Sequence, residues 1–210
     1  MYKPPMVLSQ FIHTARKRKK RKLLGEFYNF PPSTMAIGRL DEDSEGLLLL
    51  TTDGKTSHRF RSGEEKVEKE YYCQVDGIII DEAVEAMKAG LEINIQGQKV
   101  QTLPCQSRRI PCPNSCDEHP LPECIPKPVR KIRDVRHGPT SWVSITLTEG
   151  KYRQVRKMTA AVGYPTLRLV RVRIGDVTLL DDGMMRMGEV RKIQFESSSG
   201  ATTTTTTANE

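Results

Sequence analysis

The sequence lacks any apolar run long enough to cross a lipid bilayer, which requires about 20 residues. Its first residues, MYKPPMVLSQF, also lack the long apolar core of a secretory signal. These two absences argue against an integral membrane protein and against a protein exported by such a signal. Since the chain starts abruptly in strand-like sequence, an upstream domain or targeting segment could precede it.

Cysteine is scarce, with five residues in the chain, and four of them fall between residues 105 and 124. A small secreted protein usually has an even number of cysteines, spread along the chain as a disulfide framework. The odd number and the clustering therefore predict reduced thiols and an intracellular protein. We expect the cytoplasm, with an organelle or the nucleus as alternatives.

The clustered cysteines leave one metal site open as an alternative. Cys112, Cys116, His119 and Cys124 have the spacing C-x3-C-x2-H-x4-C, and such side chains can bind zinc. The spacing does not match the usual zinc motifs, however, and seven of the thirteen prolines lie in residues 105–140. We therefore favour a proline-rich surface insertion over residues 105–140, with no bound metal.

Positive charge is abundant and concentrated. Lys and Arg number 33 against 26 Asp and Glu, and the run RKRKKRK (residues 16–22) accounts for the whole excess. Residues 127–173 contain twelve Lys or Arg against two acids. Such clusters suit a polyanion, because phosphates release counterions when cations bind them. The sequence has no recognition-helix motif, so RNA is favoured over DNA. The 16–22 run is interpreted as an RNA contact, with a nuclear localisation signal or a solvated loop as alternatives.

Hydrophobic patterning predicts an α+β protein with a mixed, mostly antiparallel sheet and flanking helices. We expect strands in residues 1–12, 34–38, 47–51, 69–77 and 141–150, a hairpin over 91–103, and helices over 55–61, 81–90 and 152–163. The segment TLRLVRVRIGDVTL predicts a strand with a basic face formed by Arg168, Arg171 and Arg173. One domain of two lobes should span residues 1–196, and residues 197–210 form a low-complexity tail expected to be disordered.

One acidic turn is a candidate for chemistry. The segment GRLDEDSEGLLLLTTDG (residues 38–54) places four carboxylates between two apolar segments: Asp41, Glu42, Asp43 and Glu45. The apolar segments would hold the turn rigidly at the edge of the core, as a reactive carboxylate requires. The alternative is an ordinary turn, in which Asp41 or Asp43 caps the backbone and the glutamates face water.

The same segment resembles the signature of the RsuA-type ribosomal RNA pseudouridine synthases. Three further stretches match in order: KPPMVLSQF (3–11), KEYYCQV (69–75) and LTEGKYRQVRKM (147–158). The resemblance covers most of residues 2–180 and is strongest to the large-subunit branch that lacks an N-terminal S4 RNA-binding domain. It implies a pseudouridine-synthase-like fold with a central RNA-binding cleft.

The resemblance also implies roles for individual residues. Asp41 corresponds to the catalytic aspartate, Arg156 to the arginine that pairs with it, and Tyr71 to the tyrosine that stacks on the target uracil. Arg39 corresponds to the residue that fills the space of the flipped base. The remaining basic residues of these motifs are expected to contact RNA: Lys3, Lys151, Arg153 and Lys157. Taken singly, Tyr71 could be a packed strand residue and the helix arginines a solvated face.

The leading hypothesis is therefore a pseudouridine synthase that isomerises a specific uridine in large-subunit ribosomal RNA. The resemblance implies base flipping and an aspartate nucleophile, with no cofactor, no metal and no membrane, in a monomer. Whether the aspartate attacks the ribose C1′ or the uracil ring stays open. The alternative is a noncatalytic RNA-binding or ribosome-assembly protein with the same fold.

Overall fold

A seven-stranded sheet forms the centre of the computed structural model, which describes residues 1–13, 21–61, 66–111, 125–129, 132, 135–179 and 185–193, and the backbone of 205–207. Six strands lie in the order β1-β3-β10-β5-β9-β8, and β11 pairs with β10. Their bounds are β1 Tyr2–Lys3, β3 Glu45–Leu47, β5 Lys69–Asp76, β8 Gln106–Ile110, β9 Thr140–Leu147, β10 Thr166–Ile174 and β11 Val177–Thr178. Among the strands that the structure describes, β3 and β10 form the one parallel pair, and the other pairs are antiparallel. The expected mixed, mostly antiparallel sheet is thus confirmed.

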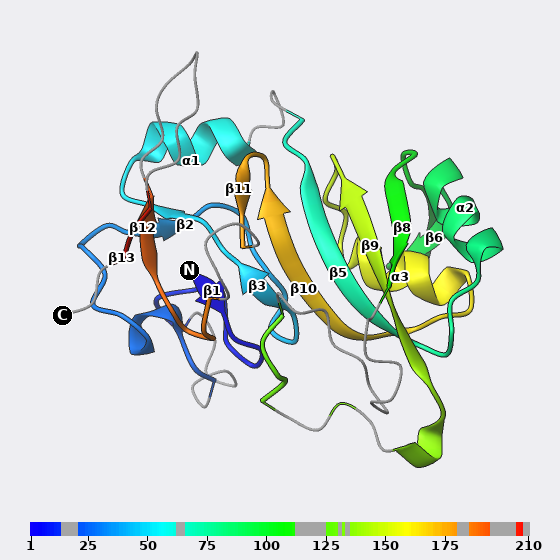
Figure 1. The fold of residues 1–210 in the computed structure, drawn as a ribbon. Coiled ribbons are helices and arrows are strands. Elements are labelled where there is room, and N and C mark those ends of the chain that lie inside the picture. Colours follow the sequence, from blue (N-terminus) through cyan, green and yellow to red (C-terminus); the bar gives the residue numbers. More distant parts are fainter. Residues whose placement is uncertain are drawn as a thin grey trace.

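Smaller elements surround this sheet (Figure 1). The helices are α1 Gly54–Arg61, α2 Asp81–Ala89 and α3 Gln154–Ala161, with short 3-10 turns η2 Leu24–Glu26 and η3 Val135–His137. Three two-stranded pairs lie apart from the main sheet: β2 Met35–Ala36 with β4 Leu50–Thr51, β6 Glu92–Ile95 with β7 Gln98–Gln101, and β12 Arg191–Ile193 with β13 Thr205–Thr207. Helices α2 and α3 lie toward the β8 end of the sheet, and α1 lies toward the β1 end.

Alternation along β5 explains why both faces of the sheet are covered. Tyr71 and Cys73 belong to an apolar cluster that includes Met87 of α2 and Met158 of α3. Tyr72 belongs to a second cluster on the opposite face, which includes Trp142 and residues of β10. Because successive strand side chains point to opposite faces, one strand can join two cores.

Most expected elements are present, and the differences have physical reasons. The helix expected over 81–90 is α2, with Ile80 at its N-cap; Asp81 is its first residue, where its charge interacts favourably with the positive end of the helix dipole. Residues 106–110 were expected to lie in a loop, but they form β8, whose hydrogen bonds go to β9.

The expected basic face of β10 is also corrected. Arg168 and Arg171 are buried, and their guanidinium groups bond to Glu45 and to the carbonyl of Leu47. Only Arg173 is partly exposed, and it pairs with Glu68 and Glu70.

Two expectations fall largely outside the described residues. These are the 16–22 run, of which Arg21 and Lys22 are described, and the tail 197–210, of which Thr205–Thr207 are described as β13. The domain boundary at residue 196 stays a prediction. Within the described part of the chain, no helix combines the length and the apolar character that crossing a membrane would require.

Gly46 fixes the distance between β3 and β10. Its φ of 102° is a conformation that side-chain-bearing residues rarely adopt, and a Cβ atom there would lie 2.3 Å from the carbonyl oxygen of Arg171. The two backbones can therefore approach closely only with glycine at this position. This contact brings the acidic turn, which precedes β3, next to the second half of the chain.

Candidate active site

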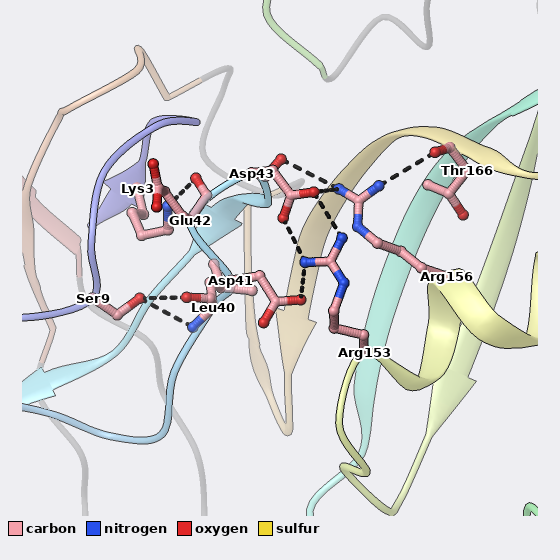
Figure 2. A network of polar contacts seen from close by, with 9 residues as sticks. All are labelled: Lys3, Ser9, Leu40, Asp41, Glu42, Asp43, Arg153, Arg156 and Thr166. Carbon is pink, nitrogen blue, oxygen red and sulfur yellow. Dashed lines mark hydrogen bonds and ion pairs between the residues drawn. The ribbon is translucent and has the colours of Figure 1, made fainter. Parts of the chain in front are cut away.

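The acidic turn is held at the edge of the sheet by backbone hydrogen bonds (Figure 2). The hydroxyl of Ser9 donates to the carbonyl of Leu40 at 2.8 Å and accepts from the amide of Leu40 at 3.1 Å. The amide of Ser44 closes the turn by donating to the carbonyl of Asp41 at 3.1 Å. Asp41 is therefore anchored at both of its ends, which agrees with the rigid position that the sequence predicted.

Lys3 supports this turn from the interior of the protein and is not placed to bind RNA. Its side chain is 0% exposed, and its ammonium donates to the carbonyls of Pro4 at 2.9 Å, Val7 at 2.7 Å and Glu42 at 3.5 Å. Burial lowers the pKa of Lys3 to about 8, although the nearby acids oppose this shift. The expected RNA contact is corrected, because no phosphate can reach a fully buried ammonium.

Arg153 joins two carboxylates of the turn. Its Nη1 lies 3.3 Å from Asp41 Oδ2 and 3.0 Å from Asp43 Oδ1, and its Nη2 lies 2.9 Å from Asp43 Oδ2. Burial alone would raise the pKa of Asp43, but hydrogen bonds from Arg153 and the charges of Arg156 and Arg153 outweigh burial and lower it. Arg153 precedes α3 with a left-handed backbone, φ 51°.

Arg156 lies beside this pair but on Asp43, not on Asp41. Its Nη2 lies 3.3 Å from both the carbonyl oxygen and Oδ2 of Asp43, and its Nη1 donates to the carbonyl of Thr166 at 3.3 Å. The arginine that the sequence paired with Asp41 is thus one helical turn from the arginine that contacts it, Arg153 (Figure 2). Both come from the basic segment before and within α3.

Asp41 lines a cavity of about 470 Å³. The cavity brings together most of the predicted site residues: Arg39, Asp41, Tyr71, Lys151 and Arg153 all line it. Arg39 is exposed and Tyr71 is half-buried. Lys157, on α3, is half-buried and does not line this cavity.

Three residues of the site had no predicted role of their own: Asp43, which was named only as a member of the acidic turn, Lys69 and Arg171. Arg171 lines the cavity and donates from Nε to the carbonyl of Leu47 at 2.8 Å, while its buried Nη2 has no hydrogen-bond partner among the described residues. Burial and the charge of Arg171 lower the pKa of Lys69, which also lines the cavity. The motif KEYYCQV, which contains Tyr71, begins with Lys69, so this motif was an available signal for Lys69.

The end of the basic run reaches the same turn. Arg21 forms an ion pair with Glu42 at 3.0 Å, and the amide of Leu8 donates to the carbonyl of Lys22 at 3.0 Å. The possible zinc ligands Cys112, Cys116, His119 and Cys124 lie outside the described residues. Within the described ranges, no group of three metal-ligating side chains is present, and Cys73 and Cys105 are free thiols.

Comparison with known proteins points to one family. A family model described as RNA pseudouridylate synthase matches residues 1–161. A ribosomal large subunit pseudouridine synthase E of Xanthomonas axonopodis pv. citri is 44% identical over 176 residues, covering 83% of each chain. A protein of the same name from Xanthomonas campestris pv. campestris is 41% identical and covers 91% of this chain and 95% of its own. A crystal structure of a pseudouridylate synthase superposes with a TM-score of 0.64 at 27% identity, covering 90% of this chain and 66% of that one.

Proposed function

Because the chain belongs to the RNA pseudouridylate synthase family, we propose that it isomerises a specific uridine of large-subunit ribosomal RNA with Asp41 as the nucleophile. The chain is an RNA pseudouridine synthase by its family, as the resemblance of its motifs predicted. The names of its relatives, ribosomal large subunit pseudouridine synthase E, support the large ribosomal subunit as the source of the substrate.

The reaction needs a positioned nucleophile and no net oxidation. The bond between ribose C1′ and uracil N1 breaks, a bond between C1′ and C5 forms, and one hydrogen is transferred from C5 to N1. Attack by a carboxylate on C1′ or on the uracil ring yields a covalent intermediate that permits the base to turn. Both routes require an ionised carboxylate positioned against the nucleotide.

The position of Asp41 carries the proposal. Its carboxylate lies at a cavity that also contains Tyr71, while its Oδ2 contacts Arg153 at 3.3 Å. Its Oδ1 has no hydrogen-bond partner in the described part of the chain, so one oxygen keeps its lone pairs for attack. The cavity volume of about 470 Å³ falls within the range of small-ligand sites and admits a single flipped base.

The other cavity residues suit a flipped uracil. Tyr71 offers an aromatic face for stacking and a hydroxyl tip. Extrusion of the base costs about a few kcal/mol. Exposed Arg39, which also lines the cavity, can offset part of this cost by filling the vacancy in the stack.

Asp43 completes the site by holding two guanidinium groups. Without its negative charge, Arg153 and Arg156 would both turn toward Asp41 and occupy its oxygens. With Asp43 in place, Asp41 receives a single contact at 3.3 Å. We therefore assign Asp43 a positioning role, in which it holds the two arginines so that Asp41 stays accessible.

The test compares wild type with Asp41→Asn on large-subunit ribosomal RNA that lacks the modification. Carbodiimide labelling with primer extension maps pseudouridine, and filter binding measures RNA affinity. We expect one modified site with wild type, none with Asp41→Asn, and similar affinities for both. Equal modification by both proteins would rule out Asp41 as the nucleophile, and binding without modification by wild type would favour the noncatalytic alternative.

A further inference from the structure

A second hollow adjoins the cavity at Asp41 and has a volume of about 680 Å³. It shares part of its wall with the Tyr71 cavity, including Arg39, Asp41, Lys151 and Arg153. We call it the outer groove, and the residues that line it alone include Met6, Ser9, Glu42, Asp43 and Tyr152. Because the two hollows share a wall, a nucleotide next to a base in the first cavity can lie in the second.

The outer groove presents apolar and aromatic surface to solvent. Tyr152 is 60% exposed and Met6 is 42% exposed, although large apolar and aromatic side chains are usually buried in a core. The Tyr152 hydroxyl makes no hydrogen bond to any described residue, so its ring is not held there by a polar contact. Exposed aromatic rings beside a nucleic-acid site serve as platforms on which bases stack.

Backbone strain also gathers at this groove. Four non-glycine residues have positive φ in the described part of the chain, and two of them, Met6 at 64° and Arg153 at 51°, line the outer groove. The remaining two are Ser33 and Gln96. Such conformations cost about 1–3 kcal/mol each and cluster at functional sites. Tyr152, which also lines the groove, directly precedes Arg153 in the chain.

The charges of the outer groove favour a base over a phosphate. Its three carboxylates are paired: Asp41 and Asp43 with Arg153, and Glu42 with Arg21. Lys151 is paired with Glu149. Arg39 is then the groove cation without an ion pair among the described residues, so little net positive charge is available for a phosphate. A near-neutral hollow with an exposed ring suits the flat face of a nucleobase.

We propose that the outer groove binds the base adjacent to the target uridine, which stacks on the ring of Tyr152. This inference rests on the proposed function, because it requires the target base to occupy the Tyr71 cavity. It makes Tyr152 a residue for RNA affinity and for sequence context, with no part in bond making.

The experiment uses a short RNA from the mapped target site, with 2-aminopurine placed in turn on each side of the target uridine. Stacking on Tyr152 should quench the fluorescence at one of the two positions. Tyr152→Ala should abolish this quenching and raise KM for the RNA roughly 5- to 100-fold, as expected for the loss of one stacked base. We expect kcat at saturating RNA to stay within about twofold of wild type. Tyr152→Phe should keep both the quenching and the KM.

A matched control is Tyr28→Ala, because Tyr28 is also an exposed tyrosine, at 40%, but lies outside the outer groove. This variant should keep the quenching. Unchanged quenching and KM in Tyr152→Ala, or equal loss in Tyr28→Ala, would overturn the proposal. Asp41→Asn separates it from the proposed function: this variant should still quench 2-aminopurine while forming no pseudouridine. Quenching together with modification by Asp41→Asn would refute the nucleophile and leave the outer groove assigned.

Discussion

Arg153 and Asp43 form a two-point ion pair, with 3.0 Å and 2.9 Å between their nitrogen and oxygen atoms, and the same Nη1 of Arg153 reaches Asp41 at 3.3 Å. The contact to Asp41 is therefore the weakest of the three. A guanidinium that is fixed by one carboxylate can orient a second without covering both of its oxygens. This geometry leads to the first prediction.

Asp43→Asn should lower kcat roughly 10- to 100-fold, because the two arginines lose the charge that holds them and shift toward Asp41. RNA affinity should stay equal or rise slightly, since one negative charge is removed. Single-turnover kinetics with a binding assay separate the two effects. Glu42→Gln is the matched control. It removes one negative charge from the same turn, but native Glu42 pairs with Arg21 and not with the site arginines, so kcat of this variant should not change. Equal losses in both variants would contradict a specific role for Asp43.

Replacing Glu45 by Gln should destabilise the fold strongly. Glu45 accepts hydrogen bonds from Arg168 at 2.5 Å and 3.0 Å and from the Tyr2 hydroxyl at 3.0 Å, with both ion-pair side chains almost fully buried. Removing one charge of such a pair leaves the other uncompensated, at a cost of about 3–5 kcal/mol. Urea unfolding measures the change.

The control for Glu45→Gln is Glu92→Gln, because Glu92 pairs with Lys99 at 2.8 Å on the surface. Exposed ion pairs contribute little, so the unfolding midpoint of this variant should match wild type. Similar midpoints for both variants would show that the buried network does not stabilise the fold.

Gly46→Ala should both destabilise the protein and reduce its activity. The added Cβ atom would meet the backbone of Arg171 at 2.3 Å and 2.8 Å, so β3 and β10 must separate and the Asp41 turn must move. Gly97→Ala isolates this clash from backbone strain, because Gly97 also has positive φ, 87°, but has open space around it. We expect about 1–2 kcal/mol for Gly97→Ala with full activity, and a larger loss for Gly46→Ala. Equal losses of stability in the two variants would mean that the positive φ, and not the clash with Arg171, causes the destabilisation.

The burial of Lys3 predicts a pH dependence of stability. The pKa of Lys3 falls from 10.5 to about 8 in the folded chain. Between these two values the unfolded chain holds a proton that the folded chain has released, so this group makes the free energy of unfolding rise with pH. Below about pH 8 both states are protonated and the contribution is constant.

Lys3→Met provides the comparison for this pH effect. Unfolding free energies from pH 7 to 10 should give a wild-type-minus-variant difference that rises with pH above about 8. Trends from Tyr2 and Cys105, whose pKa values burial raises, are common to both proteins and cancel in the difference. A flat difference would mean that Lys3 keeps its ordinary pKa.

Local patterns were sufficient to predict the elements that depend on neighbours in sequence. The apolar periodicity of α2, the end of that helix at Gly90 and the hairpin around Gly97 follow from spacing and turn chemistry. The rigid acidic turn was predicted in the same way. It depends on the apolar residues that flank it.

Features that depend on distant partners were missed. Alternation along β10 cannot reveal that Arg168 finds Glu45, which lies 123 positions away, and so a buried arginine was interpreted as surface. The pairing that makes residues 106–110 a strand is supplied by β9. The family resemblance pointed to both Arg153 and Arg156, but side-chain geometry across the cavity decides which carboxylate each one contacts.

The parallel pairing of β3 with β10 has a consequence for when the site forms during synthesis of the chain. Asp41 and Arg153 are 112 positions apart in the sequence. The acidic turn that contains Asp41 is positioned by β10, and β10 follows α3 in the sequence. During synthesis the ribosome must therefore deliver nearly all of β10 before the site around Asp41 is complete. A prematurely released fragment would carry the aspartate without its surroundings, and catalysis begins only when the last central strand takes its place.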